Sequence, residues 1–323
     1  MRFVIYGAGA VGGVIGARLH EHGHDVVLIA RGDHLRAIER DGLRIESPDG
    51  EATLRIPAVE SPAAIEFGER DAVILSVKSQ NTASALRTLA DVTTEVPVVC
   101  AQNGVENERS ALRLFPDVYA VHVMLPASHL EPAVVQASSS PVTGLLDVGR
   151  YPSGADETAH GLAAAFNAAT FDSRAVADIM RWKYRKLIMN LGNAVEALLP
   201  SGPEQDEIAR RAEEEGEACL RAAGIAFASR EEDRARRGGL MEVRPIRGTE
   251  RGGGSTWQSL VRGARTIEAD YLNGEIVLLG REHGFPTPVN EALQRLANRW
   301  AAEGREPGTF PPQELSTIVS ERP

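Results

Sequence analysis

The stretch that decides the fold reads Arg2-Phe3-Val4-Ile5-Tyr6-Gly7-Ala8-Gly9-Ala10-Val11-Gly12. Its apolar first half has the length of one β-strand, and its glycines form the G-x-G-x-x-G pattern that opens a nucleotide-binding helix. Gly7 permits the tight turn, Gly9 lets the backbone approach a pyrophosphate, and Gly12 lets the helix pack closely on the strand. The N–H groups at the start of the helix then face the phosphates. We therefore predict that a dinucleotide is bound by Gly7, Ala8, Gly9, Ala10, Val11 and Gly12.

The rest of the first half alternates short β-branched runs with amphipathic stretches, a pattern typical of a parallel sheet covered by helices. Strands are expected at residues 3–6, 25–30, 71–77, 96–100 and 119–124. Beyond about residue 171, helical periodicities dominate and strand alternation disappears. We therefore predict an α/β chain with two domains. An amino-terminal Rossmann-type doubly wound sheet is expected over residues 1–172, and a carboxy-terminal all-helical domain over residues 173–323.

Composition and charge narrow the class of protein. The 323 residues are 43% hydrophobic and carry a formal net charge of −10, whereas a nucleic-acid-binding protein normally displays a basic face. Cys100 and Cys219 lie far apart and lack the Cys/His spacing of a zinc site. No apolar stretch has the length of a membrane span or the form of a signal peptide. We therefore expect a cytoplasmic protein without a nucleic-acid partner, membrane contact, disulfide framework or metal centre, and a homodimer stays open.

The end of the second expected strand indicates which dinucleotide binds. An NAD enzyme usually places an acid there to hold the ribose hydroxyls, but this chain has Ala30 and Arg31. A guanidinium matches a phosphate through paired hydrogen bonds, so Arg31 favours NADPH. The alternative is that Arg31 is solvated and that Asp33 serves the ribose. Lys78 and Asn103 follow the third and fourth expected strands, at the sheet edge that faces a ligand, and we predict that both contact the cofactor.

Residues 179–193 are predicted to form a mainly apolar helix that carries a narrow polar stripe. Lys186, Asn190 and Asn193 recur at i, i+4 and i+7, which places them on one helical face. Either asparagine could be satisfied at a domain interface, whereas burying an ammonium without a counter-charge is costly. The stripe is therefore a candidate catalytic and substrate-binding surface.

A second long helix is expected from residue 257 to about residue 283, before Gly284. Ser255 and Thr256 lie at its start, in a sequence that fits a capping box, and Glu268 lies in its middle. Residues 230–254 are rich in Arg, Glu and Gly and lack an apolar period, so they are predicted to form a mobile loop or a frayed helix end. The proline-containing tail from residue 305 is predicted to be an extended surface segment.

These motifs, in this order, resemble the ketopantoate reductases (2-dehydropantoate 2-reductases) over essentially the whole chain. The matching stretches are GAGAVG at residues 7–12, Asn103-Gly104, Arg185-Lys186-Leu187 with Asn190, and the run from Glu268 to Gly274. The resemblance implies NADPH-dependent reduction of a 2-oxoacid. It assigns the general acid to Lys186, and to Glu268 a catalytically important place at the substrate and cofactor. It also implies that Asn103 lies near the nicotinamide and that Asn190 helps to hold the substrate.

The implied chemistry agrees with the residue types. An ammonium at Lys186 can donate a proton to the developing alkoxide and stabilise that oxygen electrostatically. Ser255 or Thr256, at a helix N-terminus, suits the substrate carboxylate, although helix capping is an equal alternative for Ser255. The sequence departs from the family where Ala194 replaces a second asparagine, which leaves Asn193, and where residues 252–254 are glycines. Ketopantoate is thus the leading substrate, and a different branched or larger 2-oxoacid stays open.

Two other functions remain alternatives. A hydroxyacid or opine-type dehydrogenase could use His122 or His129 as acid and base, although neither has an obvious acidic orienting partner nearby in the sequence. A non-enzymatic NADPH-sensing protein would bind the cofactor without consuming it. Replacement of Lys186 and loss of NADPH absorbance distinguish these alternatives from the lysine mechanism.

Overall fold

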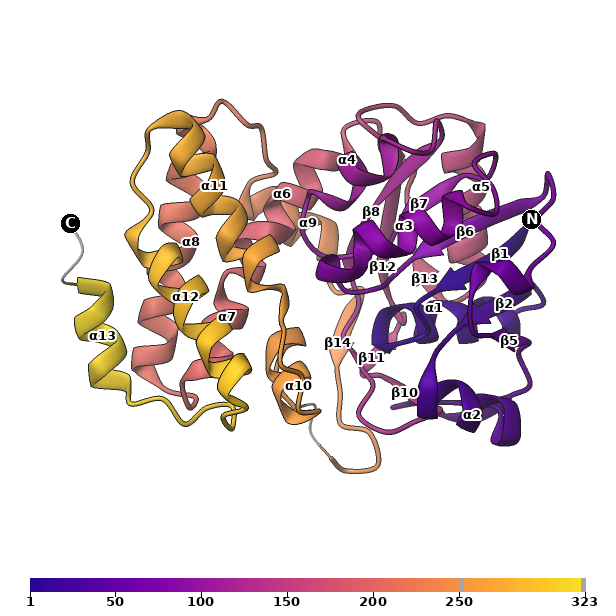
Figure 1. The fold of residues 1–323 in the computed structure, drawn as a ribbon, viewed down its shortest axis with the longest axis horizontal. Helices are drawn as coiled ribbons and strands as arrows, with labels where there is room; N and C mark the ends of the chain where they lie inside the picture. Colours follow the sequence, from indigo (N-terminus) through magenta and orange to yellow (C-terminus); the bar gives the residue numbers. More distant parts are fainter. Residues whose placement is uncertain (250–251, 321–323) are drawn as a thin grey trace. The chain divides into compact units, whose positions relative to one another are not determined.

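The structure, a computed structural model, describes residues 1–249 and 252–320. The chain divides into two compact units (Figure 1). One unit comprises Met1–Lys183 and Arg230–Arg251, and the other comprises Tyr184–Ser229 and Gly252–Pro323. This division differs from the expected boundary at residues 172 and 173, because a segment of the second half of the sequence returns to the first unit.

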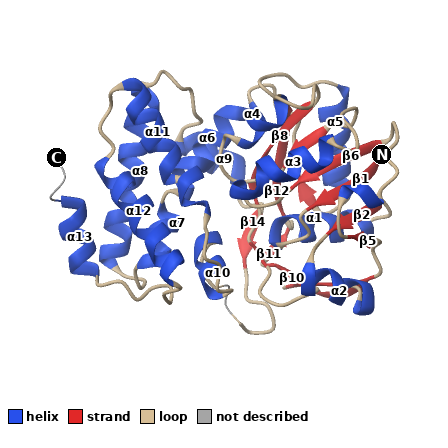
Figure 2. Ribbon diagram, in the orientation of Figure 1, coloured by secondary structure: helices blue, strands red, loops and turns tan. Residues whose placement is uncertain are grey.

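The first unit is built on an eight-stranded sheet, counted over the described residues (Figure 2). β1 lies inside the sheet and pairs in parallel with both β2 and β6, whereas β12 runs antiparallel to β8. Across the sheet, the strands are β13 (Phe171–Asp172), β12 (Gly144–Arg150), β8 (Val118–Met124), β7 (Val98–Cys100), β6 (Asp71–Leu75), β1 (Arg2–Tyr6), β2 (Asp25–Ile29) and β5 (Ala58–Val59). All five predicted strands are therefore confirmed.

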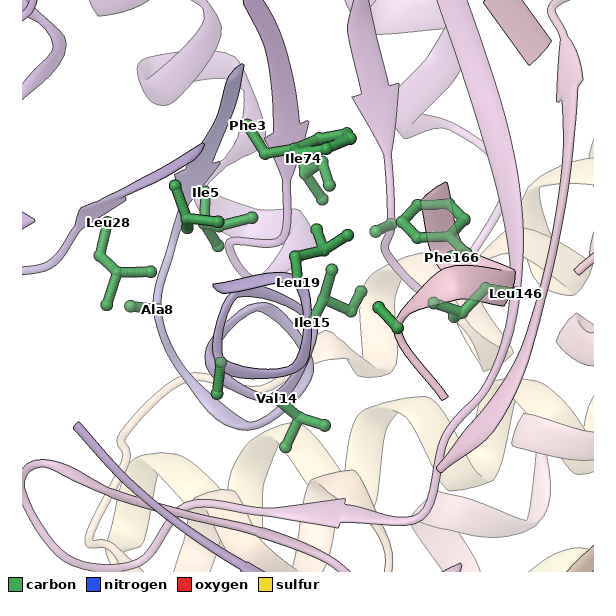
Figure 3. Packing of buried hydrophobic residues seen from close by; sticks show 14 of the residues in the cluster. Phe3, Ile5, Ala8, Val14, Ile15, Leu19, Leu28, Ile74, Leu146 and Phe166 are labelled. Atoms are coloured by element: carbon green, nitrogen blue, oxygen red, sulfur yellow. The ribbon is translucent and has the colours of Figure 1, made fainter. Parts of the chain in front are cut away.

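Apolar side chains cover both faces of this sheet, because successive residues of a strand point to opposite faces. In β1, Phe3 and Ile5 join one apolar cluster, whereas Val4 and Tyr6 join the other. Figure 3 shows the first cluster around the helix that follows β1. The covering helices are α1 (Ala10–Glu21) and α5 (Glu157–Ala168) in the first cluster, and α3 (Thr82–Ala90) and α4 (Asn107–Leu112) in the second.

The two faces explain where a ligand can bind. α1 follows β1 and packs on one face, whereas α3 follows the adjacent strand β6 and packs on the other. In an open α/β sheet, ligands bind outside the carboxyl ends of the strands at such a change of direction. The segments after β1 and β6 therefore flank the candidate cofactor site.

Smaller elements complete the first unit. A four-stranded sheet has the order β4-β3-β10-β9, and β11 pairs antiparallel with β14. Their bounds are α2 (Gly32–Asp41), β3 (Leu43–Ser47), β4 (Gly50–Leu54), η1 (Pro62–Ala64), η2 (Ser79–Asn81), β9 (Ala127–Ser128), β10 (Val134–Ala137), β11 (Ser139–Pro141), α9 (Arg230–Arg237) and β14 (Met241–Val243).

Among the residues that the structure describes, the second unit contains helices and connecting loops but no strand. α6 (Ile179–Asn190) begins in the first unit and ends in the second. The remaining elements are α7 (Gly192–Leu198), α8 (Pro203–Ala222), α10 (Ser255–Val261), η3 (Glu268–Tyr271), α11 (Asn273–His283), α12 (Pro288–Glu303) and α13 (Pro312–Ser320). The predicted fold class, a Rossmann-type sheet followed by a helical domain, is confirmed.

Within the described ranges, no helix combines the length and the apolar character that crossing a lipid bilayer requires.

The segment at residues 230–249 contains the helix α9 and the strand β14, so the prediction of a loop or frayed helix end was wrong. Arg236 of α9 is buried, and its guanidinium donates two hydrogen bonds of 2.6 and 2.7 Å to Asp147. Burial opposes ionisation of Asp147, but the neighbouring His122 ring and the hydrogen bonds from Arg236 hold its pKa below the usual value. Ion pairing to a distant strand stabilises this helix, and an apolar period cannot reveal such a partner. Residues 250 and 251 lie outside the described residues.

The prediction of one long helix from residue 257 is also wrong. α10 ends after Val261, because Gly263 adopts φ +72° and closes a Schellman motif. In this motif the Gly263 N–H donates to Leu260 O and the Ala264 N–H donates to Ser259 O. The expected stop at Gly284 is confirmed, since this residue caps α11 in the left-handed conformation.

Two further expectations need correction. The predicted helix over 179–193 breaks at Leu191, whose carbonyl accepts a 3.1 Å hydrogen bond from the buried Asn273 side chain. The tail contains α13 rather than extended chain throughout, because Pro312 occupies the first helical position, where its missing N–H costs nothing.

Candidate active site

The predicted site residues fall into two groups, one in each unit. In the first unit, Gly7 has φ +107° and requires the conformational freedom of glycine. A Cβ on Gly7 would lie 2.9 Å from Val77 N, and a Cβ on Gly12 would collide with Ser76 Oγ and Gly7 O. Ser76 Oγ also donates a 2.9 Å hydrogen bond to Gly7 O. The segments after β1 and β6 are therefore packed together through these glycines.

Gly9 differs from its two neighbours in the motif. A Cβ on Gly9 would meet no atom within 4 Å, so this stretch of backbone faces open space. Gly9 is also the N-cap of α1, which has no side-chain cap hydrogen bond and no acidic residue in its first turn. An open approach to uncapped N–H groups fits an anionic pyrophosphate.

Arg31 lies two residues after the end of β2 as the N-cap of α2, and its side chain is exposed. The alternative ribose ligand, Asp33, forms an ion pair with Arg36 within α2. Burial raises the pKa of the Tyr6 hydroxyl, and the positive charge of Arg31 acts in the opposite direction. Arg31 thus stands at the end of β2 close to the end of β1, where an adenosine ribose phosphate could reach it.

The loops after β6 and β7 hold the other two predicted cofactor residues. Lys78 precedes η2, and Asn103 precedes Gly104, which has φ +81°. Asn103 O accepts a 2.9 Å hydrogen bond from the Asn107 side chain and a 3.4 Å hydrogen bond from Ser79 Oγ. Both loops are thus linked to each other through side-chain bonds at the ligand edge of the sheet.

The sequence interpretation missed a contact of the glycine motif. His34 in α2 lies 2.7 Å from Ala8 O through Nε2, and its Nδ1 accepts a 3.0 Å hydrogen bond from the Ala133 N–H. The His34 ring also packs against His129, with ring centroids 4.3 Å apart. Only the fold brings residues 8, 34 and 133 together, although a histidine three residues after Arg31 was visible in the sequence.

In the second unit, the polar stripe is divided between two helices. Lys186 and Asn190 are four residues apart in α6 and lie on one face, with Lys186 half-buried. Asn190 is 5% exposed, and its Nδ2 has no hydrogen-bond partner among the described residues. Because buried amides are ordinarily paired, this nitrogen is available to a ligand. Asn193 lies on α7, beyond the break at Leu191.

Ser255 and Glu268 lie together although both were expected in one helix. Ser255 Oγ donates a 3.4 Å hydrogen bond to Glu268 Oε2, and Glu268 is only 5% exposed. The capping box is wrong, because the N-cap is Gly254 and no side chain caps α10. Thr256, the other predicted carboxylate ligand, is buried at 3% exposure.

Gly254 connects this pair to α7. Its N–H donates a 2.9 Å hydrogen bond to Glu196 Oε2, and a Cβ on Gly254 would lie 3.2 Å from Asn193 Oδ1. Asn193, Ser255 and Glu268 therefore belong to one polar cluster of the second unit. Glu196 was missed by the sequence interpretation, because nothing in the local pattern distinguishes it from an exposed helical acid.

Trp257 accounts for two of the glycines that depart from the family pattern. A Cβ on Gly252 would lie 2.7 Å from Trp257 Cζ3, and a Cβ on Gly253 would lie 2.5 Å from Trp257 Cγ. The indole thus lies flat against this backbone, which only glycine permits. The wall next to Ser255 is therefore aromatic, where the resembling enzymes often have an amide.

The histidine alternative gains no support from the first unit. His122 is fully buried, and its Nδ1 lies 3.9 Å from an Asp147 carboxylate that Arg236 already occupies. His129 Nδ1 bonds to Val134 O at 2.9 Å.

Over the described residues, no three His, Cys, Asp or Glu side chains are grouped to hold a metal ion.

Comparison with known proteins identifies relatives over nearly the whole chain. Residues 3–152 match the family model described as ketopantoate reductase PanE/ApbA, and residues 178–301 match the model of its C-terminal part. Two proteins named 2-dehydropantoate 2-reductase, from Pyrococcus horikoshii and Halobacterium salinarum, are 30% and 31% identical to this chain. The alignments cover 92% and 93% of this chain and 96% and 99% of the relatives.

Solved structures also resemble this chain over most of its length. The crystal structure of a PanE/ApbA family ketopantoate reductase from Ralstonia eutropha JMP134 is 31% identical, with a TM-score of 0.78, and the match covers 94% of this chain and 99% of that one. A ternary structure of D-mandelate dehydrogenase with NADH and anilino(oxo)acetate shares the fold, with a TM-score of 0.80 at 22% identity and the same coverage.

Proposed function

The chain belongs to the ketopantoate reductase PanE/ApbA family, and we propose that it reduces 2-dehydropantoate, or a related 2-oxoacid, with NADPH. The carbonyl carbon of the substrate gains a hydride and the carbonyl oxygen gains a proton, which gives the 2-hydroxyacid. The observation that carries the proposal is the cluster of Asn193, Ser255 and Glu268, which offers hydrogen-bonding groups to a small polar molecule.

The first unit fits a dinucleotide. Open space over Gly9 and the uncapped start of α1 suit a pyrophosphate, and Gly7 and Gly12 permit the close packing beneath it. When bound, the cofactor supplies the hydride. In the proposal, the residues from Gly7 to Gly12 hold the phosphates, and Lys78 and Asn103 hold the portion of the cofactor that lies over β6 and β7.

The proposed preference for NADPH rests on Arg31. Its guanidinium is exposed at the end of β2, where it can pair bidentately with a ribose phosphate. Asp33, which would favour NADH, is paired with Arg36.

We assign the proton donor to Lys186. An ammonium donates readily to a developing alkoxide and stabilises the negative charge that remains until transfer is complete. Asn190, on the same face of α6, presents an unpaired buried amide nitrogen to the substrate. Hydrogen bonding from that nitrogen would orient the oxoacid relative to Lys186.

Ser255, Asn193 and Glu268 are proposed to hold the remainder of the substrate. A carboxylate at Glu268 accepts a hydrogen bond from a substrate hydroxyl. The single Ser255 hydroxyl hydrogen can turn from Glu268 to donate to the substrate carboxylate instead. α10 has only seven residues, so the Ser255 hydroxyl matters more than a helix dipole. The indole of Trp257 beside them would accept an apolar branch, which suits branched 2-oxoacids.

The test is loss of NADPH absorbance with ketopantoate and a panel of straight, branched and aromatic 2-oxoacids, repeated with NADH. We expect turnover with at least one branched 2-oxoacid and a higher kcat/KM with NADPH than with NADH. Tight NADPH binding without consumption by any panel member would instead indicate a cofactor-sensing protein.

A further inference from the structure

The geometry points to Lys183 and Glu108 as positioning residues that hold the cofactor loops after β6 and β7, a role that rests on the proposed function. Lys183 lies in α6, and Glu108 lies in α4, just beyond Asn103. Their side chains are 3% and 0% exposed, and they form an ion pair. Neither residue has a part in the proposed hydride or proton transfer.

Lys183 also makes a contact that an ion pair alone does not require. Its ammonium donates a 3.0 Å hydrogen bond to the backbone carbonyl of Gln102, the residue before Asn103. A buried ion pair is often no more stabilising than two apolar side chains of similar volume. An apolar pair could not bond this carbonyl, so the charged pair supplies loop geometry that packing alone would not.

Gln102 transmits this constraint to the neighbouring loop. Its side-chain amide donates a 2.7 Å hydrogen bond to Val77 O and a 2.8 Å hydrogen bond to Thr82 Oγ1. Val77 immediately precedes Lys78. The backbone of Gln102 is thus fixed by Lys183, and its side chain fixes the backbone next to Lys78.

A second branch returns to Asn103. Thr82 Oγ1 donates a 2.8 Å hydrogen bond to Asn107 Oδ1, and Asn107 Nδ2 donates a 2.9 Å hydrogen bond to Asn103 O. The network therefore holds the backbone at both predicted cofactor residues of these loops. Lys186 follows Lys183 by three residues in α6, so the helix that carries the proposed acid is tied to the same network.

The experiment compares the wild-type protein with the double variant Lys183→Met/Glu108→Leu, which removes both charges and leaves Gln102 O without its donor. NADPH binding is measured by fluorescence titration, and KM and kcat are measured separately. We expect the Kd and KM for NADPH to rise about tenfold, as for loss of one buried hydrogen-bond donor, with a smaller change in the KM for the 2-oxoacid.

Arg185→Met/Glu217→Leu is the matched control. It removes another ion pair of the same helix, formed 2.9 Å apart by the buried Arg185 and the partly buried Glu217. Neither residue belongs to the hydrogen-bond network around Gln102, so this variant should leave the NADPH Kd within about twofold. Thr82→Val is a near-isosteric variant that interrupts the network without changing charge, and it should raise the NADPH Kd about threefold. It replaces the double variant as the test if the double variant does not fold.

Unchanged NADPH affinity in a folded double variant, or in Thr82→Val when the double variant does not fold, overturns the inference. Equal weakening by the Arg185→Met/Glu217→Leu control also overturns it. Failure of the wild-type protein to bind NADPH would instead contradict the proposed function, so the two failures are distinguishable.

Discussion

The Ser255 hydroxyl donates a hydrogen bond to Glu268 Oε2 across 3.4 Å, although 13 residues separate the two in the sequence. The turn at Gly263 makes this possible, because it ends α10 and lets the chain reverse before η3. A helix that continued through Gly263 would have kept Ser255 and Glu268 apart by several turns. The reversal therefore creates a place where a hydroxyl and a carboxylate can act on the same small molecule.

Glu268→Gln should impair substrate binding. The amide keeps the shape of the side chain but loses the charge that strengthens a hydrogen bond from a substrate hydroxyl. We expect kcat/KM for the 2-oxoacid to fall about ten- to a hundredfold, mainly through KM. Asp270→Asn is the control, since Asp270 is exposed and bonded to Gln294 and Asn298 of α12. Similar losses in both variants would contradict the assignment to Glu268.

Gly12→Ala should destabilise the first unit and weaken NADPH binding. The added methyl group would collide with Ser76 Oγ and Gly7 O, and overpacking of this kind costs about 1–3 kcal/mol. Gly161→Ala, within α5, meets no atom within 4 Å and should raise the free energy of unfolding by about 1 kcal/mol. Urea unfolding checks both changes, and equal effects of the two substitutions would contradict the close packing at Gly12.

Arg236→Met should detach α9 from the sheet of the first unit. Removing the guanidinium leaves Asp147 buried without its partner, which we expect to cost about 3–5 kcal/mol in the free energy of unfolding. Arg244→Met, which removes an exposed ion pair with Glu242, should change the free energy of unfolding by less than about 0.5 kcal/mol. Chemical denaturation measures both, and a wild-type stability in Arg236→Met would show that α9 is not held by this ion pair.

The glycine motif should also make stability depend on pH through His34. Burial lowers the pKa of His34 below its usual 6.5, with the hydrogen bond to Ala8 acting in the opposite direction. The unfolded chain therefore takes up a proton first as the pH falls, so the contribution to stability is complete above about pH 6.5 and is lost below it.

Measurement of the free energy of unfolding between about pH 8 and pH 5 tests this, with His34→Gln as the comparison. The variant should lose stability less steeply on acidification. His24, whose pKa burial also lowers, is present in both proteins and cancels in the difference. Parallel pH profiles would contradict the role given to His34.

The parts of the fold that local pattern controls were predictable. Gly7 to Gly12, the buried strands and the stop at Gly284 depend on steric and periodic properties that neighbouring residues express. α9 was not predictable, because the residue that stabilises it, Asp147, lies in a strand 89 residues away. Gly263 lies within the helix that the sequence predicted, and its role as a helix stop depends on hydrogen bonds that only the folded turn shows.

The arrangement of the candidate site residues was only partly predictable. Lys186 and Asn190 share a face as predicted, whereas Asn193 belongs to another helix because Asn273 bonds to Leu191 O at the break. Ser255 was predicted to lie in a helix capping box, whereas its hydrogen bond to Glu268 depends on the reversal of the chain after α10. Tertiary hydrogen bonds between distant residues, which no local pattern encodes, account for these differences.

The proposed role of Lys186 is tested by the kcat of Lys186→Met with ketopantoate and saturating NADPH, alongside an NADPH titration of the same variant. Because the methionine cannot donate a proton, we predict that kcat falls about 10²- to 10⁴-fold while the Kd for NADPH stays within about twofold of wild type. A kcat near that of the wild-type enzyme would contradict the assignment of the proton donor to Lys186.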